Sequence, residues 1–403
     1  MTSKLLFGGA AMHGERRRAN ESKIWQRHFL ASLKRDLRAA GFNLLRSSNG
    51  MPFEVLPPDN GLQLSYMHRL REQQIMSASS FISRMEAIGI LVQFGRGSQI
   101  RLESIQPKIQ FCESRADHEV FRYCKLFHRI PTTNRVGRQL RALVYDVGQD
   151  RPLLMGAFEL ASGAYTLGCR DVYLNWNDPS KTHVKQMGLR RTMDLASVIA
   201  LPPYNFLLGG KLVAALALSD VVLAEFRRRY KSPLLGLVAT SATGLHCAIL
   251  NRIGLKPGGL YRRIGATAGY STIFASAQTL SHARGCLENF VSAPKGEFSV
   301  SVRPLYVLRE ALEACGFAPE RILRSAYAKG VYFGAVSDGC VRALRSGRGR
   351  RIPHLSVDAI LTYWRERYLQ KAVTKPTQLT HFISYEPHGP LALTNSGDSA
   401  CSG

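Results

Sequence analysis

The chain has 403 residues, of which 45% are hydrophobic, so it is long enough for one large domain or two ordinary domains with buried cores. Its 54 lysines and arginines against 29 aspartates and glutamates give a formal net charge of +25 at pH 7, which favours a polyanionic partner. Nucleic acid is the commonest such partner and a membrane surface the second, and a basic protein with merely solvated arginines is the alternative.

Several protein classes are disfavoured by this sequence. The longest apolar stretch, residues 207–218, contains Lys211 and is too short to span a bilayer, so we expect no membrane partner. The first 18 residues do not follow the order of a signal peptide, and we expect a cytoplasmic location. The 8 cysteines and 11 histidines are dispersed without CxxC or HExxH spacing, which predicts reduced thiols and no metal site.

The first 110 residues are predicted to be basic and largely helical. Residues 1–20 are expected to form a flexible basic leader, and apolar residues at helical spacing predict a helix over residues 21–40 that ends before Gly41. A second helical stretch over residues 66–88 precedes a strand–turn–strand pattern over residues 89–102. Residues 21–110 are therefore predicted to form either a winged-helix DNA-binding module or a helical lid on the main domain.

The middle of the chain is predicted to combine strands and helices. Strands over residues 138–147 and 151–160 form an antiparallel hairpin, and residues 192–201 form a third strand. The segment PPYNFLLGG, residues 202–210, follows this strand. Beyond it the pattern predicts one or two helices, a strand, a short helix and a strand, over residues 211–231, 234–240, 245–253 and 260–265.

The rest of the chain is predicted to be mainly helical, with residues 301–372 as a C-terminal helical region. Residues 330–336 are predicted to form a lone strand, and residues 373–403, rich in Thr, Pro, Ser and Gly, a disordered tail. The predicted fold class is α/β (α+β), a mixed sheet flanked by helices. The predicted helices cover residues 278–291, 303–316 and 356–371.

The order of the middle elements resembles the N-acyltransferase-like (GNAT) fold. In that fold a central strand opens into a glycine turn, and the next helix points its amino end at the pyrophosphate of an acyl-CoA. Helix amino ends attract anions, and glycines let a ligand approach the backbone. The alternative is that the glycines only let strand and helix pack tightly, and Phe206 stands where acyltransferases carry Arg or Gln. The resemblance implies a GNAT-like sheet with an acyl-CoA site at Leu208, Gly209, Gly210, Lys211 and Leu212.

Three consecutive segments resemble the DruA family, named for the Druantia anti-phage defence system. They are RPLLMGAFELASGAYTLGCRDVYLNW, LPPYNFLLGGKLVAALALSD and LVATSATGLHCAILNRI, and a Gly-x-Thr-x-Gly-Tyr turn follows at residues 265–270. The resemblance implies a DruA-like domain over residues 111–300, with a role in phage defence or on a mobile element. It also implies action near DNA, with other defence-system proteins as partners. Residues 246–250 depart from the expected pattern, and the resemblance implies no settled reaction.

Two residues are candidates for catalysis. Asp171 follows Arg170 amid aromatic residues, and it is interpreted either as a general base or as half of a structural salt bridge. Tyr204 lies just before the glycine pair, where a ligand would lie, although a turn residue needs no further function.

Basic clusters are the candidates for nucleic-acid binding, with a solvated surface as the alternative. Residues 227–231 and 342–351 are the two densest clusters, and Tyr261 precedes two arginines in a pattern typical of stacking on single strands. The predicted contacts are Arg227, Arg228, Arg229, Lys231, Arg262, Arg263, Arg348, Arg350 and Arg351.

Three functions remain open at this point. The first is a DNA-binding defence protein, and the second is an acyl-CoA-dependent transferase that modifies a nucleobase or a protein amine. The third is a metal-dependent nuclease or transposase, which needs a carboxylate cluster for Mg²⁺. Such a cluster would form only if Asp171, Asp178 and Asp194 converge in the fold.

Overall fold

The chain forms two compact units, defined by contacts within each. The helical unit comprises residues 1–67 and 268–328, and the sheet unit comprises residues 68–267 and 329–403. Their boundaries differ from those predicted at residues 110, 300 and 372. The computed structural model describes residues 7–39, 42–46, 53–56, 60–132, 135, 137–241, 244–267, 275–289, 304–323, 328–347 and 354–395.

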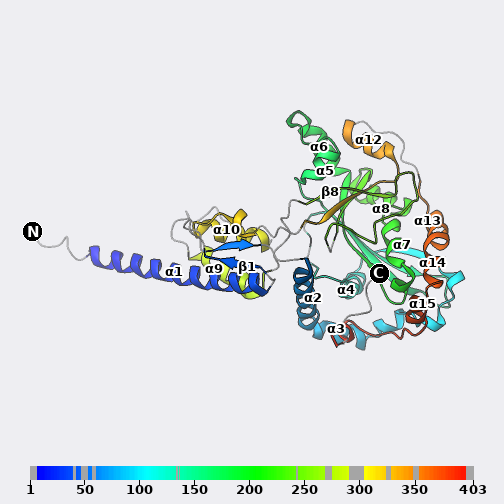
Figure 1. The fold of residues 1–403 in the computed structure, drawn as a ribbon, viewed down its shortest axis with the longest axis horizontal. Helices are drawn as coiled ribbons and strands as arrows, with labels where there is room; N and C mark the ends of the chain where they lie inside the picture. The colour runs from blue at the N-terminus through cyan, green and yellow to red at the C-terminus, as the bar shows by residue number, and fades with distance from the viewer. Residues whose placement is uncertain are drawn as a thin grey trace, which may run out of the picture. The chain divides into compact units, whose positions relative to one another are not determined.

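The helical unit contains the long helix α1 (Phe7–Ala39), so the described part of the predicted flexible leader is helical instead. Phe29, Leu33 and Leu37 recur every four residues of α1, and all three are fully buried. The unit also contains two antiparallel strands, β1 (Asn43–Leu45) and β2 (Glu54–Leu56), and the helices α9 (Ala277–Glu288), α10 (Pro304–Ala314) and α11 (Pro319–Leu323) (Figure 1).

A seven-stranded mixed sheet forms the centre of the sheet unit, in the order β3-β4-β5-β6-β7-β9-β8 (Figure 1). Among the described residues, neighbouring strands are antiparallel except for the parallel pair β6–β7. The predicted mixed α/β class is therefore confirmed, and the strand predicted to be alone, β9, lies between two others. The strands are β3 (Pro107–Phe111), β4 (Gln139–Asp146), β5 (Leu153–Ala161), β6 (Thr192–Ala200), β7 (Gly236–Thr240), β8 (Tyr261–Ala266) and β9 (Gly330–Gly334).

The parallel pairing at the centre of the sheet is short. β6 has 9 residues, but its ladder with β7 covers only the first three, Thr192 to Asp194. The rest of β6, residues 195–200, pairs with β5 on its other side. Beyond Asp194, β6 and β7 therefore do not continue this ladder.

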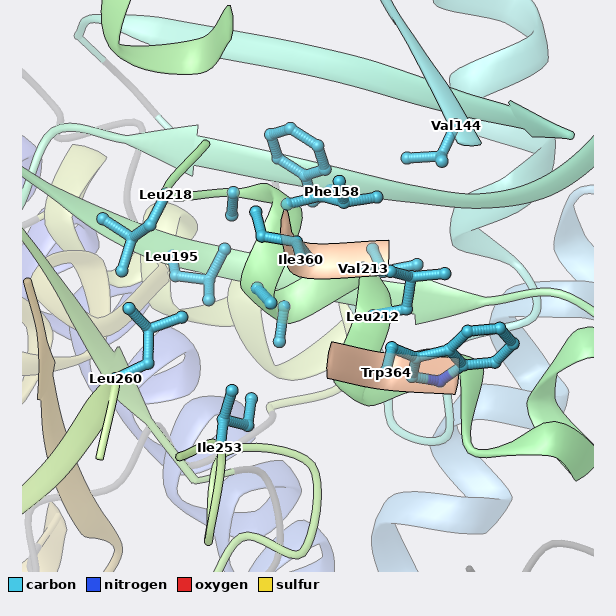
Figure 2. Packing of buried hydrophobic residues seen from close by; sticks show 14 of the residues in the cluster. Val144, Phe158, Leu195, Leu212, Val213, Leu218, Ile253, Leu260, Ile360 and Trp364 are labelled. Carbon is cyan, nitrogen blue, oxygen red and sulfur yellow. The ribbon is translucent and has the colours of Figure 1, made fainter. Parts of the chain in front are cut away.

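Helices cover one face of the sheet around an apolar core. Figure 2 shows side chains of α7 (Gly209–Leu216) and α13 (Val357–Trp364) beside Phe158 and Leu195 of the sheet. Helix α8 (Asp220–Tyr230) contributes Val222 and Phe226 to the same cluster.

The opposite face carries two smaller apolar clusters, because successive strand residues point to opposite faces. For example, Val331 and Phe333 of β9 belong to one of them, and Tyr332 belongs to the larger core. Within the described part of the chain, six helices contribute residues to these two clusters: α2 (Asn60–Ser77), α3 (Ser79–Ala87), α4 (Arg115–Lys125), α5 (Gly168–Tyr173), α6 (Thr182–Arg190) and α12 (Asp338–Ser346).

The strand–turn–strand predicted over residues 89–102 is wrong. The segment forms three short 3₁₀ turns, η1 (Ile90–Gln93), η2 (Gly97–Gln99) and η3 (Leu102–Ser104). Its apolar residues do not line one strand face, since Phe94 packs in one core and Ile100 in another. The predicted wing of a winged helix is therefore not found in this segment.

Two further predictions are corrected by the structure. Residues 245–253 form turns and not a helix, and Arg252 within them has a left-handed φ of 61°. The predicted disordered tail is helical in the part that the structure describes, with Phe382 and Tyr385 buried. Residues 396–403 of that tail lie outside the described residues. The remaining elements are η4 (Pro179–Lys181), η5 (Tyr204–Leu207), η6 (Arg365–Leu369, a π-helical turn), α14 (Gln370–Val373), α15 (Pro376–Ile383) and α16 (Ala392–Asn395).

Candidate functional site

A pocket of about 280 Å³ opens in the sheet unit, and we call it the β8–α12 pocket. Strands β8 and β9, helices α5 and α12 and the loop before β8 supply its lining. The pocket therefore brings together parts of the chain that are far apart in sequence. The lining residues are Tyr173, Lys256, Pro257, Gly258, Arg262, Phe333, Ala335, Asp338 and Val341.

Two aromatic rings line this pocket and are held in place by their neighbours. The rings of Tyr173 and Phe333 lie 5.5 Å apart at 47°. Phe333 is 2% exposed and packs over Gly236, where an added Cβ would lie 2.3 Å from the Phe333 ring. The Arg345 guanidinium lies 5.1 Å from the centre of the Tyr173 ring and donates two hydrogen bonds, of 3.0 and 2.7 Å, to the Tyr173 carbonyl. Both rings therefore pack against other side chains of the sheet unit.

Cations outnumber acids at the mouth of the pocket. Lys256 Nζ lies 2.9 Å from Asp338 Oδ1, and their side chains are 17% and 72% exposed. The bond from Lys256, followed by the charges of Arg342 and Arg262, holds the pKa of Asp338 below its usual range. Both arginines are exposed. Three cations around one carboxylate leave a positive field at the opening, which attracts anions.

The arginine cluster at the end of α8 is largely neutralised within the protein. Arg228 forms ion pairs of 2.7 Å with Glu225 and 2.9 Å with Glu113, and Arg229 pairs with the same two carboxylates. The hydrogen bonds from Arg228 and Arg229 lower the pKa of Glu225. Arg227 and Lys231 are exposed, and neither forms an ion pair with the described residues.

The other predicted nucleic-acid contacts fall in different places. Arg262 lines the β8–α12 pocket and Arg263 is exposed on the same strand. Tyr261, predicted as their stacking partner, is buried and donates a 2.7 Å hydrogen bond to the Ala214 carbonyl, so that interpretation is wrong. Arg348, Arg350 and Arg351 lie outside the described residues.

Asp171 is a buried member of an ion-pair network. Its carboxylate accepts hydrogen bonds of 2.9 and 2.7 Å from Arg170 and of 2.9 Å from Lys185. Arg170 also donates to the Ala164 and Tyr165 carbonyls, at 2.7 and 2.9 Å, and thereby fixes the loop before α5. This geometry is that of the structural salt bridge, the second of the two interpretations given for Asp171.

Tyr204 is also part of the interior. Its side chain is fully buried, and its hydroxyl donates a 2.9 Å hydrogen bond to Asp146 Oδ2. Burial and the adjacent Asp146 carboxylate raise the pKa of Tyr204 well above its usual range. A phenol held in this way anchors the turn before α7 to the end of β4.

The amino end of α7, predicted as an acyl-CoA site, is covered by the protein's own residues 247–251. Lys211 Nζ donates 2.6 Å hydrogen bonds to the Ala248 and Asn251 carbonyls, and burial lowers the pKa of Lys211 to about 8. The Ile249 side chain lies over Gly210, 3.3 Å from an added Cβ, and Leu208 adopts a left-handed φ of 58°. Leu212 is buried in the core.

Gly209 is needed for close packing of the turn. An added Cβ would lie 2.6 Å from the Tyr204 carbonyl oxygen, which is closer than real contacts allow. Gly209 therefore has the packing role that was the alternative to a phosphate cradle.

The three candidate carboxylates of a metal site do not form a ligand cluster. Asp178 caps the turn η4 and is exposed, whereas Asp171 is held by Arg170 and Lys185. Burial raises the pKa of Asp194 to about 6, against the attraction of Arg135 and Arg170. Within the described residues, no group of three His, Cys, Asp or Glu side chains could hold a metal ion. Among the same residues, no helix combines the length and apolar character that a bilayer crossing requires.

Lys256, Phe333 and Asp338 are pocket residues that the sequence did not single out. They come from a loop, a buried strand and a helix start, and no local motif connects them. The cluster at residues 342–351 was the nearest signal, because Arg342 and Arg345 of α12 belong to it.

The fold and the pocket define a strongly basic mixed α/β protein with a cationic, aromatic-lined pocket. The family model described as Druantia protein DruA matches residues 63–332. The Druantia protein DruA of Escherichia coli (strain UMEA 4076-1) is 25% identical over 295 residues, which cover 69% of this chain and 71% of that protein. No solved structure matches the chain. The chain belongs to the DruA family and thus to the proteins of Druantia anti-phage defence.

Proposed function

We propose that this DruA-family protein binds DNA in phage defence, with the mouth of the β8–α12 pocket as a principal contact surface. The observation that carries the proposal is the placement of Lys256, Arg262 and Arg342 around Asp338 beside two aromatic rings. Phosphate contacts from lysines and arginines supply most non-specific affinity for DNA, and the net charge of +25 favours the same partner.

Residues 247–251 cover the amino end of α7, which favours DNA binding over acyl-CoA-dependent transfer as the function. In a transferase of the GNAT type, the amino end of the helix after the glycine turn must be open to the pyrophosphate. Here Lys211 is engaged by the Ala248 and Asn251 carbonyls, and Ile249 covers Gly210. Beyond Asp194, β6 does not pair with β7, but the space beside the amino end of α7 is filled by the chain itself.

Fluorescence anisotropy with labelled DNA across a salt series tests the proposal. Each phosphate contact contributes about 0.9 to the slope of log K against log salt, so losing one weakens binding about tenfold at about 50 mM salt. We expect this loss in Arg262→Gln and Arg342→Gln.

Arg228→Gln is the matched control, since Arg228 is equally exposed but already paired with Glu225 and Glu113. We expect Arg228→Gln to keep most of the affinity and slope. The proposal is refuted if the wild-type chain does not bind DNA at low salt. It is equally refuted if the two pocket variants bind as tightly as wild type throughout the series.

A further inference from the structure

We infer that the β8–α12 pocket receives one unpaired nucleobase, so that the chain distinguishes single-stranded or distorted DNA from continuous duplex. This inference rests on the proposed function, because it names which part of the DNA enters the site. Its basis is the order of side chains from the interior of the pocket to its mouth.

The deep part of the pocket is aromatic. Tyr173 is half-buried and is the ring that a base can reach, whereas Phe333, at 2% exposure, packs beside it with its ring 5.5 Å away. Aromatic side chains stack on bases of any sequence, because every base has a π face. The Arg345 guanidinium lies 5.1 Å from the centre of the Tyr173 ring and is itself held by two hydrogen bonds to the Tyr173 carbonyl.

The cationic side chains of the pocket lie nearer to its opening than the aromatic rings do. Lys256 is 17% exposed at the wall, and Arg262 and Arg342 are exposed at the opening. A nucleotide in a strand has the same order, with an aromatic base on one side and a charged phosphate on the other. A site for phosphate alone would not require the two rings, and a purely apolar site would not require the three cations.

The size of the pocket selects a single base. Pockets that enclose drug-sized ligands measure roughly 300–1,000 Å³, and this one, at about 280 Å³, falls just below that range. A base pair or a stacked dinucleotide is too large to enter. A base within duplex DNA is paired and stacked on both faces, so it must leave the helix before it can enter such a pocket.

The experiment compares DNA ligands with equal numbers of phosphates. The wild-type chain is titrated with labelled oligo-dT, with an abasic oligomer that has the same backbone, and with a duplex of half that length, whose two strands together carry about as many phosphates. Stacking of one base is expected to make oligo-dT bind about 5- to 150-fold more tightly than the abasic oligomer. We also expect oligo-dT to bind more tightly than the duplex.

Variants at Tyr173 test whether the preference for oligo-dT over the abasic oligomer arises in the β8–α12 pocket. Tyr173→Leu should bind oligo-dT and the abasic oligomer alike, whereas Tyr173→Phe, which keeps the ring, should retain the preference. Val172→Ala is the control on the same helix, since Val172 is 65% exposed and does not line the pocket.

The outcomes separate the inference from the proposed function. Absence of binding to any ligand at low salt overturns the proposed function and the inference together. Equal affinity of the wild-type chain for oligo-dT and the abasic oligomer, or for oligo-dT and duplex, overturns the inference and leaves DNA binding intact. A preference that survives in Tyr173→Leu overturns the assignment to this pocket.

Discussion

Replacing Asp171 with alanine tests whether this residue supports the fold or a reaction. The Asp171 side chain is 5% exposed and pairs with Arg170 and Lys185, whose side chains are 1% and 11% exposed. Alanine leaves both cations buried without their counter-charge, and breaking a buried ion pair costs about 3–5 kcal/mol. Arg170 keeps its bonds to two carbonyls and Lys185 lies closest to solvent, so we expect the lower end, about 3 kcal/mol.

Denaturant unfolding followed by circular dichroism measures this loss. Asp150→Ala is the control, because its ion pair with Arg101 involves an Asp150 side chain that is 89% exposed. We expect that control to change the free energy of unfolding by less than about 1 kcal/mol. DNA binding by folded Asp171→Ala should equal that of wild type. The reasoning is refuted if Asp171→Ala unfolds within about 1 kcal/mol of wild type yet loses a DNA-dependent activity.

Four other substitutions have expected outcomes. Tyr204→Phe removes one of the hydrogen bonds to the buried Asp146 carboxylate and should lower the free energy of unfolding by about 1–3 kcal/mol in urea titration. Gly209→Ala should cost about 1–3 kcal/mol because its Cβ would meet the Tyr204 carbonyl, whereas Gly210→Ala, which meets only the Ile249 side chain, should be tolerated in the same titration. Because the pKa of Asp194 is raised from 3.8 to about 6 in the folded state, its ionisation lowers the stability progressively between these pH values, and the full cost is present above about pH 6. Asp194→Asn should therefore raise the unfolding temperature at pH 7 and much less at pH 4, and equal shifts at both pH values would contradict this assignment.

The sequence predicted the sheet well where local patterns match the final packing. The hairpin β4–β5 and the strand β6 have apolar residues and turn residues that specify them without reference to distant partners. Residues 89–102 were mispredicted because their apolar side chains enter two different cores, which alternation along a sequence does not reveal. Residues 373–403 were predicted to be disordered from their composition, yet Phe382 and Tyr385 are buried by the rest of the sheet unit.

The site was less accessible to sequence analysis than the fold. Arg262 was singled out from its local cluster, but the residue next to it, Tyr261, was assigned a stacking role that its burial rules out. The rings that line the pocket are Tyr173 and Phe333, from helix α5 and strand β9. Only the pairing of β9 between β7 and β8 brings Phe333 beside Arg262, which it faces in the strand register.

The distribution of ion pairs predicts that the net charge and the β8–α12 pocket contribute separately to the proposed DNA binding. Glu159, Asp171 and Glu225 are buried acids, and each is bound to two cations of the protein. These acids cannot offset the cations exposed elsewhere, so part of the excess positive charge remains at the surface, where under the proposed function it attracts DNA of any sequence. Charge removal at Arg227 or Lys231 should then weaken binding to single strands and duplex alike. Loss of the Tyr173 ring should instead reduce the preference between the two, because only an unpaired base reaches it.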